Sequence, residues 1–189
     1  MESDRDNKFK LQEDEQYLSV GKFLVKFEHL TYSMKHKLSS LCGTSTMTDL
    51  LLAPYSVKQT LDVLQQVVLL RAKEREIPEC DINLYKQLFK DLRLLNDERN
   101  TIVHTTWFIG WRSETTVDLL DFEGVKYGFP HSSTTKVYTV ERMNLLIDKC
   151  ETYYRMFWTI WSVDHIENIP FFSDLWNRDV NGIWERKDS

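Results

Sequence analysis

Three residues between Asn96 and Trp111 carry side chains that could bind an anion or transfer a proton: Arg99, Asn100 and His104. The planar guanidinium of an arginine matches the oxygens of a phosphate, and a histidine titrates near neutral pH, which suits proton transfer. Positive charge fixed beside a developing oxyanion is often the largest catalytic contribution. These residue types are therefore compatible with a site that binds a phosphate or transfers a proton.

The helix expected here places Arg99 on its apolar face. That face is marked by Leu84, Leu88, Leu92 and Leu95. Arg99 stands where the next leucine is expected, so its charge needs an acid from another helix, an acid from another chain, or a bound phosphate. Arg99 and His104 diverge by roughly 140° around one helix at ~100° per residue, so two facing copies would bring them to one cleft more easily. The spacing alone favours the alternative, an arginine paired inside its own bundle and a histidine at a helix end.

The apolar periodicity predicts four main helices. The first is expected from about Glu13 to Cys42, with Gly43 as the stop, and the second from Ser56, in a capping box with Gln59, to the residues before Pro78. The third is expected from an N-cap at Asp81 to about Phe108, with Gly110 as the stop. The fourth is expected from an N-cap at Thr139 to about Trp161. Before the last helix, residues 115–121 and 135–139 are rich in Thr, Val and Tyr, which predicts a small irregular or β insertion. The expected fold class is all-α, an up-and-down helical bundle.

The same pattern predicts the organisation of the chain. Residues 1–12 are polar and are expected to form a flexible N-terminal arm, and residues 13–165 form the bundle domain. Residues 166–189 form an aromatic tail, expected to pack on the bundle or on a partner through residues such as Phe171, Phe172, Trp176 and Trp184.

The bulk composition limits the classes of function. A net charge of −5 argues against a broad basic surface for long nucleic acid, although a small basic cleft remains compatible with it. Three widely spaced cysteines without a CxxC pattern indicate free thiols in a reducing compartment and no structural zinc. The charged N-terminus is no secretory signal, and no apolar run is long enough to span a membrane. We therefore expect a cytoplasmic protein.

Two further features beside Arg99 have alternative interpretations. Trp107 and Trp111 could stack on unpaired RNA bases, but such a cluster is more often core or dimer interface. Asp97 and Glu98 suggest a metal site, but adjacent helical residues point apart and no third ligand is placed. We expect no metal and no cofactor.

The stretch LLNDERNTIVHTTW resembles the signature of the HEPN superfamily, in which an arginine and a polar residue precede a histidine near the end of the third helix of a bundle. The expected layout is similar over residues 13–165: a long first helix, a second helix, the motif helix, a variable insertion and a last helix. Only the few motif residues are specific. Thr106 stands where toxin members often carry a tyrosine, so regulation by modification of such a tyrosine is not expected.

The resemblance implies a metal-independent endoribonuclease that works as a homodimer in a toxin or antiviral defence system, with RNA as substrate and an antitoxin or another defence protein as partner. It implies that His104 transfers a proton at the ribose 2′-OH or holds the phosphate, that Arg99 stabilises the phosphate charge, and that Asn100 orients one of them. Attack by the 2′-OH would leave a 2′,3′-cyclic phosphate.

Two other functions remain open at the level of sequence. One is a non-catalytic helical module that binds RNA, a nucleotide or a protein partner. The other is a purely structural subunit, which predicts that Arg99 meets a carboxylate inside its own bundle.

Overall fold

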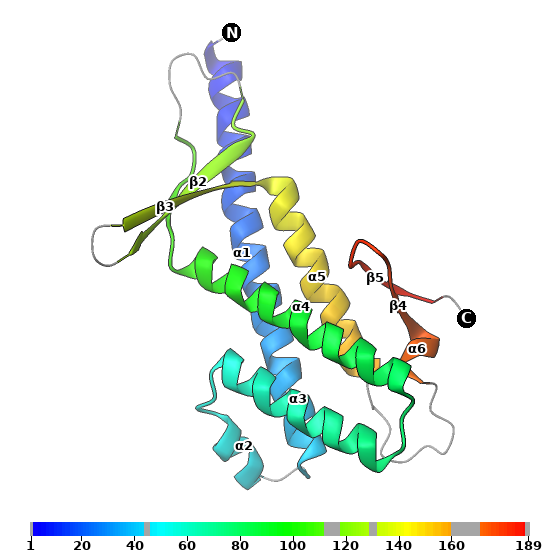
Figure 1. The fold of residues 1–189 in the computed structure, drawn as a ribbon. Helices are drawn as coiled ribbons and strands as arrows, with labels where there is room; N and C mark the ends of the chain where they lie inside the picture. The colour runs from blue at the N-terminus through cyan, green and yellow to red at the C-terminus, as the bar shows by residue number, and fades with distance from the viewer. Residues whose placement is uncertain (1, 44–45, 112–117, 129–131, 160–170, 188–189) are drawn as a thin grey trace. The chain divides into compact units, whose positions relative to one another are not determined.

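Long helices dominate the computed structural model, which describes residues 2–43, 46–111, 118–128, 132–159 and 171–187 (Figure 1). In chain order the elements are α1 (Glu2–Leu41), α2 (Thr46–Leu52), α3 (Val57–Glu74), α4 (Glu79–Val103), β1 (Thr106–Phe108), β2 (Asp121–Gly128), β3 (Ser132–Thr139), α5 (Val140–Thr159), α6 (Phe172–Leu175), β4 (Trp176–Arg178) and β5 (Trp184–Arg186). The protein is mostly helical, with a small antiparallel sheet in the order β1-β2-β3 and a separate β4-β5 pair. β3 covers residues 135–139, one of the two segments in which the sequence predicts a small irregular or β insertion. In the other predicted segment, only Asp121 lies in a strand, and residues 115–117 lie outside the described residues. β1 lies in a segment that the sequence predicts to be helical.

The chain forms two compact units, each built from two separate segments. Unit 1 comprises Met1–Glu28 and Asp97–Cys150, and unit 2 comprises His29–Asn96 and Glu151–Ser189. α1, α4 and α5 each contribute residues to both units. The sequence predicts one bundle domain over residues 13–165 because the apolar periodicity of these helices continues through the boundaries without a linker.

In unit 1, α1 is already helical where the sequence predicts a flexible arm over residues 1–12. Phe9 is buried, and the ammonium group of Lys8 forms an ion pair with Asp118. Asp118 lies far away in the sequence, so the polarity of the arm does not reveal this contact. Only contacts of this kind can order a polar segment that has no apolar face of its own.

Two glutamines of α1 bind backbone groups of Gly110, which follows β1, and of Leu119 and Asp121 near the start of β2. The side chain of Gln16 is fully buried, and its Nε2 donates to the carbonyl oxygens of Leu119 (2.9 Å) and Asp121 (3.2 Å). Its Oε1 accepts from the N–H of Gly110 at 3.4 Å. One turn earlier, Oε1 of Gln12 accepts from the N–H of Leu119 at 3.1 Å. These bonds satisfy loop backbone groups that would otherwise be buried without partners.

α4 ends at Val103, so the expectation that it continues to about Phe108 is wrong. The chain turns into β1, where Trp107 lies opposite Gly124 of β2. A Cβ at Gly124 would lie 3.0 Å from the Trp107 ring and closer still to the side chain of Thr105, so glycine is required by this close approach. Pairing with a distant strand therefore overrides the helical pattern.

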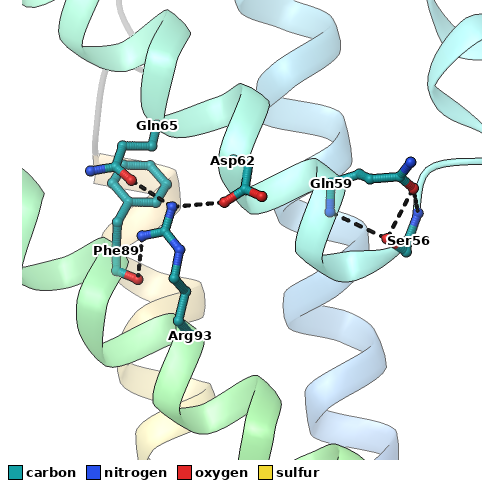
Figure 2. A network of polar contacts seen from close by, with 6 residues as sticks. All are labelled: Ser56, Gln59, Asp62, Gln65, Phe89 and Arg93. Atoms are coloured by element: carbon teal, nitrogen blue, oxygen red, sulfur yellow. Dashed lines mark hydrogen bonds and ion pairs between the residues drawn. The ribbon is translucent and has the colours of Figure 1, made fainter.

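Three predicted helix boundaries are confirmed. Gly43 follows α1 with φ of 87°, the left-handed conformation that glycine adopts easily. Ser56 and Gln59 form the predicted capping box at α3: Ser56 Oγ accepts from the N–H of Gln59 at 3.2 Å, and Gln59 Oε1 accepts from the N–H of Ser56 at 2.9 Å (Figure 2). Thr139 Oγ1 accepts from the N–H of Arg142 at 3.1 Å and caps α5.

In unit 2, Arg93 links α4 to α3. Figure 2 shows its guanidinium between the two helices: Nη2 donates to Asp62 at 2.9 Å and to Gln65 at 2.6 Å. Nη1 donates to the carbonyl oxygen of Phe89 on its own helix at 3.3 Å. The buried apolar residues of unit 2 include Leu61, Leu64, Val68, Leu88 and Leu92. Arg93 therefore joins α3 and α4 by hydrogen bonds beside their buried apolar residues.

The C-terminal tail is held by two buried carboxylates of α4. Asp81 accepts from the backbone N–H groups of Phe172 (2.7 Å) and Ser173 (3.2 Å) at the start of α6. The prediction that Asp81 caps its own helix is therefore wrong, because α4 begins at Glu79 and the carboxylate binds the tail instead.

Asp91 lies ten residues further along α4. It accepts from Nε and Nη2 of Arg178, each at 3.0 Å, and from Nε1 of Trp184 at 2.9 Å. Trp176 and Trp184 are buried, whereas Phe171 is exposed. The tail therefore packs within unit 2 through both apolar and charged contacts.

Candidate functional site

The three residues singled out in the sequence lie at the C-terminal end of α4, within unit 1. Arg99 and Asn100 belong to the last turns of the helix, which ends at Val103. His104 is the first residue after it, and its backbone N–H donates to the carbonyl oxygen of Asn100 at 3.2 Å. The end of one helix thus positions all three residues.

The charge of Arg99 is met by an acid of its own chain. Its Nη2 donates to Oε1 of Glu28 on α1 at 2.9 Å, and its guanidinium lies over the ring of Phe27, 5.6 Å from the centroid. Nη1 donates to Oδ1 of Asn100 at 3.3 Å. This arrangement is the one that the structural-subunit interpretation predicts for Arg99.

The pair between Arg99 and Glu28 is nevertheless open on one side. The side chain of Glu28 is 56% exposed and that of Arg99 is 25% exposed. Nε of Arg99 is buried and has no hydrogen-bond partner in the described part of the chain. Exposed ion pairs of this kind contribute at most about 1 kcal/mol, because water competes for both charges. Glu28 is therefore a weakly held partner of Arg99.

His104 is exposed to solvent. Among the described residues its ring has no hydrogen-bond or ion-pair partner. Asn100 gives its side-chain oxygen to Arg99, so in this structure it orients the arginine. The imidazole of His104 is therefore accessible to a ligand, whereas a ligand of the Arg99 guanidinium would have to displace Glu28.

A second charged cluster lies one residue earlier on α4, at Glu98. Its carboxylate is 20% exposed and lies 3.5 Å from the ammonium of Lys136 and 3.6 Å from the guanidinium of Arg142. Burial raises the pKa of the Tyr138 hydroxyl, and the negative charge of Glu98 raises it further. That hydroxyl is buried and makes no hydrogen bond of good geometry within the described residues. The two cations offset the charge of Glu98, which leaves it poorly suited to hold a metal.

The aromatic residues after the motif divide into packed and exposed side chains. Trp107 is half-buried, donates from Nε1 to the carbonyl oxygen of Ile102 at 3.1 Å, and packs against Phe122 and Tyr138 with centroids 5.4 and 5.1 Å away. Trp111 is 74% exposed. Stacking on a base is therefore easier at Trp111 than at Trp107.

Sequence reasoning missed Glu28 and Phe27, the residues that surround Arg99. They lie on α1, and the hydrogen bond between Glu28 and Arg99 joins positions 71 residues apart. The only signal was indirect: a guanidinium on an apolar face requires some partner. The pattern of α1 gives no means to choose among its several acids.

Several wider properties of the described chain bear on the site. No group of three or more His, Cys, Asp or Glu side chains in the described ranges could hold a metal ion. Cys42, Cys80 and Cys150 are not joined in disulfides. None of the helices, over the residues the structure describes, is long and apolar enough to cross a membrane.

No protein-family model, curated protein or solved structure matches this chain.

Proposed function

We propose that this protein is a metal-independent endoribonuclease of the HEPN type, built on a four-helix up-and-down bundle and active as a homodimer. Its setting is a cytoplasmic toxin or antiviral defence system. Arg99, Asn100 and His104 form the catalytic group, and Trp107 and Trp111 flank the path of the RNA, with Trp111 the exposed stacking surface. The proposal rests on the motif and on the local geometry at the end of α4.

The observation that supports it most is the accessibility of the two charged groups. Arg99 keeps a quarter of its side chain exposed and is held by a carboxylate that is itself mostly exposed. A phosphodiester offers oxygens that match the guanidinium fork, and it can replace Glu28 there at little cost. His104 is exposed at the adjacent helix end. Oδ1 of Asn100 accepts a hydrogen bond from the guanidinium of Arg99 and orients it.

In the proposed mechanism the imidazole of His104 removes the proton from the ribose 2′-OH, and the 2′ oxygen forms a bond to the adjacent phosphorus. The bond from phosphorus to the 5′ oxygen breaks, and the leaving oxygen takes a proton from the imidazolium of His104 in a second copy. Arg99 stabilises the charge on the phosphate oxygens. The products are a 2′,3′-cyclic phosphate and a 5′-OH, and no water or metal enters this step.

The direct test is cleavage of single-stranded RNA by purified protein in the presence of EDTA. Arg99→Ala and His104→Ala should each lower the rate by at least about a hundredfold while retaining the fold. Arg142→Ala and His29→Ala are matched controls, because both residues are exposed and lie outside the motif, and they should cleave like the wild type. Cleavage that requires a divalent metal, or that survives in His104→Ala, would contradict the proposal.

A second candidate function is favoured by the ion pair itself. Because Arg99 meets Glu28 within unit 1, a non-catalytic HEPN-like module that binds RNA, a nucleotide or a protein partner needs no phosphate at this position. In that case the wild type cleaves no RNA under any activating condition, and Arg99→Ala and Glu28→Ala produce equal, small losses of stability. Binding of labelled RNA without cleavage would identify this alternative.

A further inference from the structure

Four aromatic side chains form a continuous row at the surface of unit 2. Tyr32 and His36 lie one turn apart on α1, with ring centroids 6.2 Å apart. The ring centroid of His36 lies 5.8 Å from that of Trp158 on α5, and Trp158 lies 6.1 Å from Tyr154 on the same helix. We call these four residues the aromatic row.

The aromatic row lies outside the core of unit 2. Tyr32, Trp158 and Tyr154 are 66%, 48% and 37% exposed, and His36 is exposed as well. The side chains that α1 and α5 bury beside the row are aliphatic or aromatic neighbours: Met34, Leu38, Met156 and Phe157. A single exposed ring is ordinary on a protein surface. Adjoining exposed rings on two helices form a patch of the kind that marks a binding site.

Each ring of the aromatic row also carries a polar group at its edge: a phenol hydroxyl, an indole N–H or the nitrogens of an imidazole. Within the described residues none of these groups has a hydrogen-bond partner. The row therefore offers flat π faces together with available donors and acceptors. An unpaired nucleobase has the same two features, a flat face and a hydrogen-bonding edge, and stacks well on such rings. An apolar helix of another protein would instead bury these polar groups without partners.

The charges that lie three or four residues from the aromatic row, along the same helices, favour an anionic ligand. Lys35 donates to a backbone carbonyl oxygen at 3.1 Å, and Arg155 is exposed, so no carboxylate of the described residues offsets either cation. The acids at the same spacing are Glu28, which already pairs with Arg99, and Glu151, which makes a contact of its own. The two cations would repel a cationic ligand and attract the phosphates of a nucleic acid.

We propose that the aromatic row binds unpaired bases of a single-stranded nucleic acid. About one or two bases stack on Tyr32 and Trp158, the most exposed rings of the row, while Lys35 and Arg155 attract the flanking phosphates. Because few phosphates are contacted, the expected dissociation constant is micromolar or weaker.

This contact is separate from the proposed ribonuclease site. The aromatic row belongs to unit 2, whereas Arg99 and His104 belong to unit 1. Stacking on bases needs no 2′-OH and no bond cleavage. The proposal therefore does not rest on the ribonuclease function.

Binding of a labelled single-stranded DNA of about eight nucleotides, measured by fluorescence anisotropy in EDTA, tests the aromatic row. DNA lacks the 2′-OH, so the proposed cleavage cannot occur on it. Trp158→Ala should weaken binding by at least about tenfold, whereas Trp158→Phe keeps a stacking face and should stay within about threefold of the wild type. Tyr17→Ala is the matched control, because Tyr17 is a 56% exposed tyrosine of α1 in unit 1, and it should bind like the wild type.

An abasic strand of the same length separates stacking from attraction to phosphate. It should bind at least about tenfold more weakly than the strand with bases, because it keeps the charge and loses the stacking. Equal binding of the two strands overturns the proposal, as does a wild type that binds no DNA or a Trp158→Ala protein that binds like Tyr17→Ala. Self-association of the wild type that Trp158→Ala abolishes also overturns it, because the row would then hold a second copy.

Failure of this proposal can be told apart from failure of the ribonuclease. DNA binding that Trp158→Ala weakens, in a wild type that cleaves no RNA, supports the aromatic row and contradicts only the ribonuclease. RNA cleavage by a wild type that binds the DNA and its abasic form equally contradicts only the aromatic row.

Discussion

Arg99 in unit 1 and Arg178 in unit 2 have the same kinds of partner, an aromatic ring and a carboxylate. They differ in the number of hydrogen bonds to the carboxylate and in its exposure. Each guanidinium lies over an aromatic ring, Arg99 over Phe27 at 5.6 Å and Arg178 over Trp184 at 5.9 Å. Arg178 donates two hydrogen bonds to both oxygens of Asp91, which is only 9% exposed. Arg99 donates one to a carboxylate that is 56% exposed.

The two arginine side chains are equally exposed, 25% for Arg99 and 26% for Arg178, so the difference lies in how firmly each carboxylate holds its arginine. Hydrogen bonding to Asp91 raises the pKa of the Arg178 guanidinium, and the pair fixes the tail. Two parallel bonds to a buried carboxylate are costly to break, because removal of Arg178 leaves the charge of Asp91 buried and alone. A single bond at the surface is readily exchanged for another anion.

The largest expected effect is on Asp91. Asp91→Ala should lower the free energy of unfolding by about 3 kcal/mol, because it leaves the guanidinium of Arg178 and the indole N–H of Trp184 without an acceptor. Urea denaturation measures it. Asp62→Ala removes an exposed partner of Arg93 and should cost less than about 1 kcal/mol. Equal losses in the two variants would mean that burial of the carboxylate does not distinguish the two arginines.

A smaller loss in the free energy of unfolding is expected for a change at Gln16. This residue holds distant backbone groups in unit 1, as Asp91 holds the C-terminal tail in unit 2. Gln16→Ala should cost about 2 kcal/mol, because two backbone carbonyls and one backbone N–H lose their partner. Hydrogen exchange at Gly110 should quicken with it. Gln66→Ala, at an exposed position of α3, should change stability by less than about 0.5 kcal/mol. Unchanged exchange at Gly110 would show that the glutamine does not hold this segment.

The arginines themselves should separate stability from activity. Arg99→Ala should cost only about 1 kcal/mol of stability yet abolish RNA cleavage. Arg178→Ala should cost more stability, about 2 to 3 kcal/mol, because Asp91 is left buried and unpaired, and should keep the cleavage rate per folded molecule. Urea denaturation and a single-turnover cleavage assay on both proteins measure this. The reverse pattern would place the functional arginine in unit 2.

The smallest effect at neutral pH is expected at Tyr138. Tyr138→Phe should change stability by less than about 1 kcal/mol, because its buried hydroxyl has no good hydrogen-bond partner to lose. Burial raises the pKa of this hydroxyl above that of an unfolded tyrosine, near 10. Its contribution is therefore complete below about pH 10 and is lost as the pH rises toward the folded-state pKa. The urea midpoint should fall more between about pH 7 and pH 10.5 in the wild type than in Tyr138→Phe. Equal falls in the two proteins would contradict this assignment.

The features that could be predicted from the sequence depend on neighbouring residues. The Ser56–Gln59 box, the Thr139 cap and the turn at Gly43 each involve groups within a few positions, and the helical periods of α3 and α5 are local patterns. The features that were missed join distant positions. The end of α4 depends on pairing with β2, and Arg99 depends on a carboxylate 71 residues away. Asp81 looks like a cap for its own helix until the tail supplies its real donors.

The sequence predicts which residues form the candidate site, but not the residues that surround them. Arg99, Asn100 and His104 do lie at one helix end, and the need of Arg99 for a partner follows from its place on the apolar face. That the partner is Glu28, and that it remains exposed, depends on how α1 lies against α4 within unit 1. The proposed binding of a phosphate at Arg99 depends on this exposure of Glu28.

The most direct measurement is the identity of the RNA ends released by the purified protein in EDTA. The account predicts 2′,3′-cyclic phosphate and 5′-OH ends with the wild type and with Arg178→Ala, and none with Arg99→Ala or His104→Ala. The contradicting result is the absence of cleavage with a folded wild type under every activating condition, or 5′-phosphate ends formed only when a divalent metal is present.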